Sequence, residues 1–115
     1  MKRRSRQVGR QIQETLGVVL EREVRDPRLD LVTVTDVQVT DDLRQARVFF
    51  SVLEEERQGD ALRALQKATG FLRHELGARL NLRYTPTLIF TLDRSVAHAQ
   101  HLLNVLDKIA AEQEP

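Results

Sequence analysis

Apolar side chains recur every three or four positions from residue 8 to residue 24, which is the spacing of one face of a helix. A serine precedes this run, and serine is a preferred capping residue at the start of a helix, so we expect Ser5 to cap it. Asp26-Pro27 should end the helix, because the residue before a proline avoids the helical region. The start of the chain therefore predicts one amphipathic helix.

Residues 32–39 and 46–52 instead alternate apolar and polar side chains, as strands with one buried face do. A short polar turn separates the two segments, which predicts a hairpin. The alternation shifts near Thr35 and Asp36, and such a shift predicts a β-bulge. Residues 88–92 alternate in the same way and predict a third strand.

A second helix is predicted between the hairpin and the third strand. Asp60 should cap it, Gly70 should interrupt it, and residues 81–86 should end it. Its apolar stripe is formed by Leu62, Leu65, Leu72, Leu76 and Leu80.

Ser95 is predicted to cap a last helix, and the end of the chain, from about residue 111 to 115, is expected to fray. Its inward positions would be Ala99, Leu102, Leu103, Leu106 and Ile109. The complete order indicates an α+β fold in which helices cover one three-stranded sheet. Neither a repeat nor a linker divides the chain, so we expect residues 1–115 to form one domain.

The second helix carries a different set of side chains opposite its leucine stripe. Arg63, Lys67, Gly70 and His74 stand at i, i+4, i+7 and i+11, where the cations could meet phosphates and the glycine could allow close approach. The common alternative is an ordinary solvated helix face, which these residues alone favour. Phe71 also has two possible places: it could stack on a base, or it could return to the core, where aromatic residues are more often found.

Composition limits the class of protein. The chain has 115 residues, of which 41% are hydrophobic, and it has no cysteine, so disulfides, thiolate ligands and cysteine nucleophiles are excluded. Its apolar runs are far shorter than the roughly 20 residues that a bilayer helix needs. The basic start lacks the apolar segment of a secretory signal. We therefore expect a soluble cytoplasmic protein.

Charge is unevenly distributed although the formal net charge is only +1. Residues 1–28 carry 8 Lys or Arg against 4 Asp or Glu, and residues 63–94 carry 6 against 2, whereas the rest of the chain is acidic. If the two basic segments meet in space, the molecule has one cationic face.

The sequence offers little to an enzyme or a metal site. His98 and His101 stand three residues apart on the last predicted helix, but neither a cysteine nor a nearby carboxylate completes a ligand set. Asp26 and Asp93 stand at turns and are interpreted as structural acids. No nucleophile–base arrangement or phosphate-binding glycine loop is present. We expect no catalysis, no metal, no cofactor and no small-molecule substrate.

Seven short motifs, in order along nearly the whole chain, resemble the ribosome-binding factor A family. They are RSRQVGRQIQETLGVVL, DPR, VTVTDVQVT followed by DL, ARVFFSV, ATG followed by LR, PTLIF, and DRS. The resemblance implies a type II KH-like fold, in which Ala68, Thr69 and Gly70 form a kink between two helical segments. Ordinary KH domains place there a GXXG loop that clamps the backbone of single-stranded RNA.

The resemblance also implies a function. Members of this family are non-enzymatic factors that bind the immature 30S subunit through 16S ribosomal RNA and support its late maturation and 16S end processing, notably in the cold. For this chain it implies a monomer that contacts RNA through Arg3, Arg4, Arg6, Arg10, Arg63, Lys67, Gly70, Arg73, His74, Arg79 and Arg83. Two alternatives stay open: a KH-like module for free single-stranded RNA, and a protein-interaction domain with an acidic partner.

Overall fold

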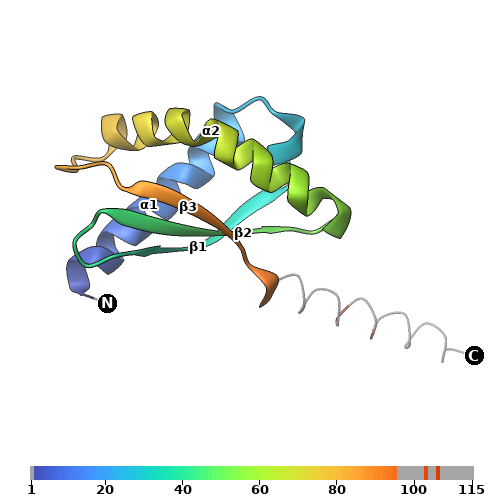
Figure 1. The fold of residues 1–115 in the computed structure, drawn as a ribbon, viewed down its shortest axis with the longest axis horizontal. Helices are drawn as coiled ribbons and strands as arrows, with labels where there is room; N and C mark the ends of the chain where they lie inside the picture. Colours follow the sequence, from blue (N-terminus) through green and yellow to red (C-terminus); the bar gives the residue numbers. More distant parts are fainter. Residues whose placement is uncertain (1, 96–102, 104–105, 107–115) are drawn as a thin grey trace, which may run out of the picture.

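A computed structural model describes residues 2–95, together with residues 103 and 106. The elements follow the order α1 (Arg3–Arg22), η1 (Pro27–Leu29), β1 (Val32–Val39), β2 (Gln45–Val52), η2 (Glu55–Arg57), α2 (Gln58–Arg79) and β3 (Thr87–Leu92). This order confirms the predicted α+β fold with a three-stranded sheet (Figure 1).

The sheet has the strand order β1-β2-β3. β1 and β2 form the predicted antiparallel hairpin, and β2 pairs with β3 in parallel. The register of the hairpin shifts between Val34 and Asp36, which confirms the predicted bulge. Because α2 connects the parallel strands β2 and β3, it lies across the sheet as a crossover helix.

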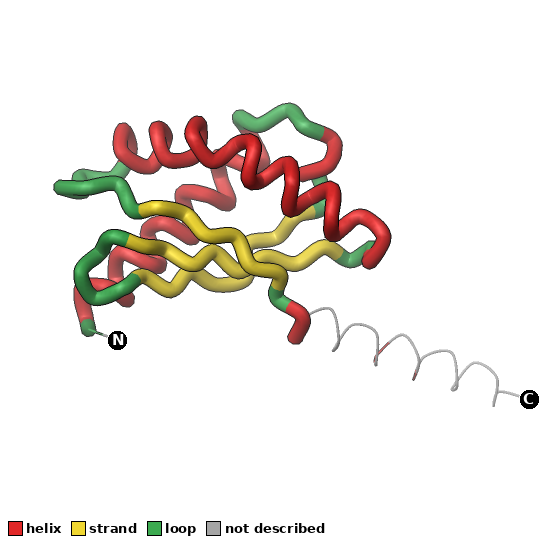
Figure 2. The backbone as a smooth tube through the Cα atoms, in the orientation of Figure 1, coloured by secondary structure: helices red, strands yellow, loops and turns green. Residues whose placement is uncertain are grey.

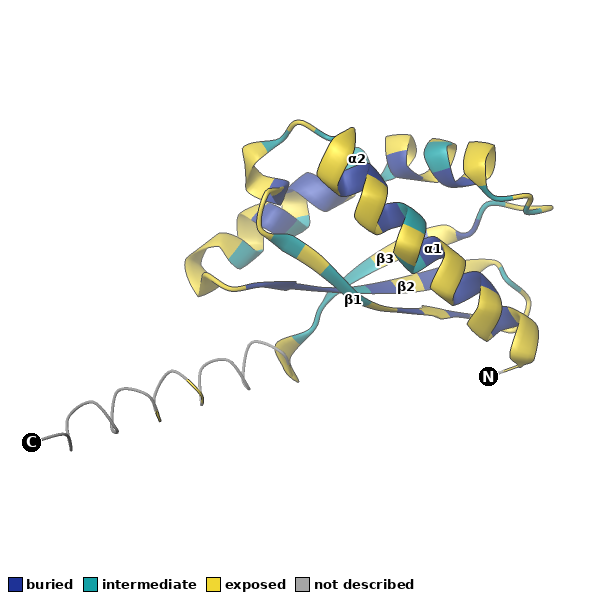
Figure 3. Ribbon diagram, turned by 180° about the vertical axis from the view of Figure 1, so that it is seen from behind, coloured by how far each residue is buried: buried dark blue, intermediate teal, exposed yellow. Residues whose placement is uncertain are grey.

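Both helices cover the same face of the sheet, and each turns its buried side toward it (Figure 3). In the hairpin, Val37 pairs with Val48 and Val39 pairs with Ala46, so all four side chains point into the core. The largest buried side chains of the core come from both helices and the central strand: Ile12, Leu16, Val19, Val48, Phe50, Leu65, Leu72 and Leu76. The predicted leucine stripe of α2 is thereby confirmed, with Leu62 and Leu80 partly buried at its ends.

Around Arg47, the opposite face of the sheet is exposed. Arg47 on β2 alternates with the buried Ala46 and Val48, and it pairs with Gln38 on one side and Ile89 on the other. This row of three side chains points away from the helices, because neighbouring residues of a strand face opposite sides.

Several predicted helix ends were wrong. Helix α1 begins at Arg3, so Ser5 lies in its first turn, where its hydroxyl donates to the Lys2 carbonyl instead of capping the helix. It also ends at Arg22, before Asp26, which caps η1 by accepting a hydrogen bond from the Arg28 backbone N–H. Helix α2 begins at Gln58, which places Asp60 inside its first turn.

The predicted interruption at Gly70 was also wrong, because α2 is one continuous helix of 22 residues and Gly70 does not have a positive φ. The axis of α2 nevertheless changes direction near its middle (Figure 2). At that point the Thr69 hydroxyl donates to the Leu65 carbonyl at 3.1 Å. A threonine hydroxyl that bonds back to residue i−4 often bends a helix. The family-implied kink at Ala68, Thr69 and Gly70 is therefore a bend without an open loop.

The predicted last helix lies mostly outside the described residues. The prediction that Ser95 caps it was wrong, because Ser95 is already helical and its backbone N–H and hydroxyl donate to the Asp93 carboxylate. Leu103 and Leu106 were expected to face inward, but they are 56% and 61% exposed.

Candidate nucleic-acid interface

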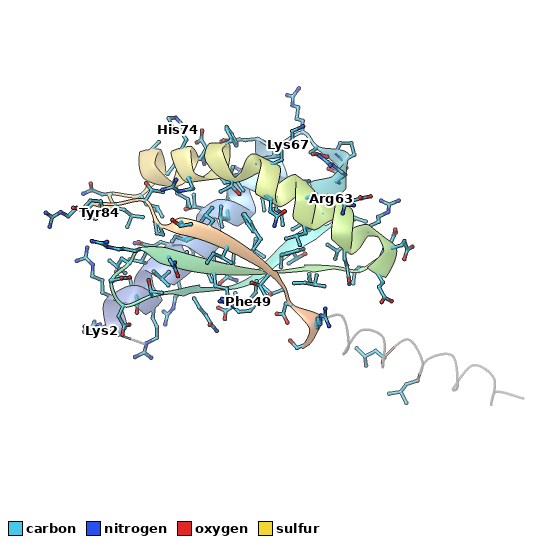
Figure 4. The ribbon with its side chains drawn as sticks, viewed as in Figure 1. Lys2, Phe49, Arg63, Lys67, His74 and Tyr84 are labelled. Carbon is cyan, nitrogen blue, oxygen red and sulfur yellow. The ribbon has the colours of Figure 1, made fainter. Side chains whose placement is uncertain are left out.

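The outer face of α2 carries the four residues that the sequence singled out. Arg63, Lys67, Gly70 and His74 are all exposed, because the leucines on the other side of the helix fill the core. Arg63, Lys67 and His74 follow one another along the helix in Figure 4. A Cβ built on Gly70 would meet nothing within 4 Å, so the backbone is bare there. We call these four residues the α2 face.

Carboxylates accompany the cations at the beginning of the α2 face. Arg63 forms an ion pair with Asp60 one turn earlier. Asp26 stands at the start of the neighbouring η1, where hydrogen bonds from Arg28, with a smaller contribution from the charge of Lys67, lower its pKa. The positive charge of this region is therefore partly balanced by the carboxylates of Asp26 and Asp60.

Arg28 belongs to this region although the sequence analysis did not select it. Its guanidinium donates to Asp26 at 2.7 Å, and the pKa of Arg28 is raised first by this hydrogen bond and then by the charges of Asp26 and Asp60. The Asp-Pro-Arg motif was a usable signal, since an aspartate before proline indicates a turn that could present Arg28. The motif alone did not show which helix this turn packs against.

Two predicted site residues are engaged inside the molecule. The Arg73 guanidinium donates to the carbonyls of Thr85 and Pro86, at 3.0 Å each, and so holds the loop before β3 against α2. Arg79 pairs with Glu75 on its own helix and with Glu23 at the end of α1. Both arginines reach solvent, but their donors already have partners within the protein. Their main role is therefore to hold neighbouring elements together.

The remaining predicted residues lie on α1 and in the loop before β3. Arg3, Arg4, Arg6 and Arg10 are exposed on α1, so the basic start is a helix and not a solvated tail. The Lys2 backbone N–H and the Ser5 hydroxyl bind Asp41 in the β1–β2 turn, at 3.1 and 3.3 Å. That turn is joined to the loop containing Arg83, because the Thr87 N–H donates to the Arg44 carbonyl. The predicted residues thus fall into two groups instead of one stripe.

Phe71 is 43% exposed, so of the two places left open by the sequence it does not take the one in the core. It follows Gly70 on α2, next to the α2 face, where an aromatic ring is accessible to a partner. A continuous helix keeps Phe71 out of phase with the buried Leu72, which explains its exposure.

Neither a metal centre nor a membrane span appears in the described part of the chain. No group of three or more His, Asp or Glu side chains among these residues is placed to hold a metal ion. No helix among them is long and apolar enough to cross a membrane. His98 and His101 lie outside the described residues.

Comparison with known proteins identifies the family. The family model of ribosome-binding factor A matches residues 4–106. The chain belongs to the ribosome-binding factor A family. A family relative from Natranaerobius thermophilus, named ribosome-binding factor A, is 43% identical over 107 residues, which are 92% of this chain and 82% of that protein.

Solved structures of the family agree with the fold. The crystal structure of ribosome-binding factor A from Thermus thermophilus superposes with a TM-score of 0.72 at 30% identity, covering 78% of this chain and 97% of that one. A homology model of the Thermus thermophilus protein, fitted into a cryo-EM map of a complex between the 30S subunit and ribosome-binding factor A, gives a TM-score of 0.64 at 31% identity and covers 75% and 91% of the two chains.

Proposed function

We propose that this protein is an assembly factor that binds the free or immature 30S ribosomal subunit. The observation that carries this proposal is the likeness, in sequence and in fold, to a Thermus thermophilus protein that has been fitted into the map of a 30S complex. In this role the protein acts in the cytoplasm as a monomer, supports late 30S maturation and 16S end processing, notably in the cold, and carries out no catalysis itself.

The contact with the subunit is made through 16S ribosomal RNA. Arg63 and Lys67 offer positive charge on the outer side of a rigid helix, and the bare backbone at Gly70 lets a phosphate or sugar come close. Such phosphate contacts position a protein on a shaped RNA surface without reading its bases. Arg3, Arg4, Arg6 and Arg10 form a second cationic group on α1, and Arg73, Arg79 and Arg83 hold or flank the loop before β3.

The alternative of a KH clamp for free single strands has less support. Such a clamp needs a GXXG loop between two helices. Here the five glycines are never three residues apart, and the position of the loop is occupied by the uninterrupted helix α2. The alternative of an acidic protein partner would be favoured if the parent protein bound neither 30S subunits nor RNA.

The experiment compares binding of the full chain to free 30S subunits, mature 70S ribosomes and short single-stranded RNAs. We expect binding to 30S, weaker or no binding to 70S, and a steep loss of 30S affinity as salt is raised, because phosphate neutralisation releases counterions. The double variant Arg63→Glu, Lys67→Glu should lose affinity while it keeps the thermal stability of the parent, since both side chains are exposed. Equal affinity for short RNAs and 30S would favour the single-strand module, and a flat salt dependence would remove the α2 face from the interface.

A further inference from the structure

The end of the molecule opposite the start of α2 carries a hollow that the α2 face does not include. It has a volume of about 350 Å³ and is lined by Arg44, Tyr84, Thr85 and Thr87. Two segments that are far apart in the sequence form it: the turn between β1 and β2, and the loop between α2 and β3. Figure 4 shows Tyr84 at this end, on the same side as Lys2 and the start of α1.

Both walls of the hollow are held in place. The Arg44 carbonyl accepts a hydrogen bond from the Thr87 N–H at 2.9 Å, and the Arg44 N–H donates to Asp42 at 3.1 Å. On the other side, the two hydrogen bonds from Arg73 fix the carbonyls of Thr85 and Pro86. The hollow is therefore a built feature between anchored segments, and a ligand would not have to order it.

Tyr84 is presented to solvent in this setting. It is 64% exposed, although it lies between anchored residues. The Arg83 guanidinium carbon lies 5.5 Å from the centre of the Tyr84 ring, a cation–π arrangement that occupies one face of the ring. The ring is also one of the walls of the hollow.

The charged side chains at the hollow are arginines. Arg44 lines it and Arg83 stands behind the ring. The two acidic residues of the turn do not line the hollow and have other partners: Asp41 accepts from Lys2 and Ser5, and Asp42 accepts from the Thr40 hydroxyl and the Arg44 backbone. A cation beside an exposed aromatic ring suits an unpaired nucleotide, whose base stacks while its phosphate pairs with arginine.

We propose that this hollow binds one unpaired nucleotide of RNA, with its base stacked on Tyr84 opposite Arg83 and its phosphate paired with Arg44. The proposal rests on the proposed function, because it deepens the contact with ribosomal RNA. It adds a base-stacking site to the phosphate contacts of the α2 face. Since every base has a flat π-face, this site tolerates any sequence but requires that the base be unpaired.

The test uses the fact that Tyr84 is the single tyrosine of the chain. Full-length protein that contains 3-fluorotyrosine gives one 19F NMR signal, which reports on this ring alone. We expect single-stranded RNA of mixed sequence to shift the signal, whereas a perfect RNA duplex and polyglutamate should leave it in place. The Arg44→Glu variant should require several-fold more single-stranded RNA for the same shift.

The second arm measures affinity for 30S subunits. Tyr84→Leu should weaken binding by about 5- to 150-fold, the range of one lost base–aromatic stack, whereas Tyr84→Phe, which keeps the ring, should bind like the parent. Because the side chain is exposed, both variants should keep the parent's melting temperature.

Two results of the 19F measurement would overturn the proposal: no shift of the signal with single-stranded RNA, or a shift of equal size with polyglutamate. A third would be a Tyr84→Leu variant that binds 30S as tightly as the parent, and this result would leave the proposed function unaffected. Failure of the parent to bind 30S at all would instead reject the proposed function, and the 19F measurement would still decide whether Tyr84 stacks on a base.

Discussion

The inner face of α1 and the outer face of α2 use glycine for opposite purposes. On α1, a Cβ built on Gly9 would lie 2.7 Å from the Val37 carbonyl oxygen, so the helix rests directly on the backbone of β1. On α2, Gly70 has nothing within 4 Å. Both residues sit in ordinary helical backbone, since no described glycine has a positive φ. The comparison teaches that glycine allows close packing of a helix on a strand in one place and leaves the helix backbone exposed in the other.

The largest expected effect concerns the close packing of α1 on β1 at Gly9. Gly9→Ala should destabilise the fold by roughly 1–3 kcal/mol, because a methyl group at 2.7 Å from a backbone oxygen forces α1 away from β1. Chemical denaturation of the two proteins measures the difference. Gly17→Ala is the matched control on the same helix, since Gly17 also has nothing within 4 Å, and it should not destabilise. Equal stability of Gly9→Ala and the parent would show that the helix and the strand do not pack this closely.

The second prediction tests whether the α2 face is a binding surface. Replacing Lys67 by alanine should remove about one phosphate contact, which lowers the slope of log affinity against log salt by about 1 for binding to 30S. Arg47→Ala is the control, because Arg47 is equally charged and exposed but lies on the sheet face away from the helices. Titrations at several salt concentrations measure both slopes. The same loss of slope in both variants would mean that the contact is spread over the whole surface.

The third prediction concerns Gly70 itself. Gly70→Ala should stabilise the fold by up to about 1 kcal/mol, because alanine is the better helix former and its methyl group meets open space. The melting temperature should rise accordingly. If 30S binding falls at the same time, the bare backbone serves the interface. Stabilisation with unchanged binding would mean that Gly70 is needed neither for packing nor for contact with 30S.

The smallest expected effect is on acid stability. The hydrogen bonds from the Lys2 N–H and the Ser5 hydroxyl lower the pKa of Asp41, and those from Arg28 lower the pKa of Asp26. A lowered folded-state pKa adds stability above the unfolded value near 3.9, and this contribution is lost as the pH falls through the folded-state pKa. Asp41→Asn should therefore flatten the fall of melting temperature below about pH 4. Asp26→Asn should flatten it less, since Asp26 binds a residue only two positions away whereas Asp41 joins distant segments. A larger effect of Asp26 would contradict this order.

Much of the candidate site could be located from the sequence, and part of it could not. The exposure of Arg63, Lys67 and His74 followed from their phase against the leucines, because a continuous helix fixes which side chains share a face. That phase also placed Phe71 outside the core, and the mistaken break at Gly70 is the reason why its burial was favoured. The internal roles of Arg73 and Arg79 were not predictable, since their partners belong to other elements.

The sequence by itself determined the elements, the bulge, the buried stripes and the family. These features depend on the spacing of apolar side chains and on motifs, which are local along the chain. Only the tertiary structure decided which residues meet: Gly9 with Val37, Arg79 with Glu23, and the turn at Arg44 with the loop at Tyr84. The physical reason is that such contacts depend on the register of the sheet and on the distance at which each helix packs on it, and both are set by the whole core at once.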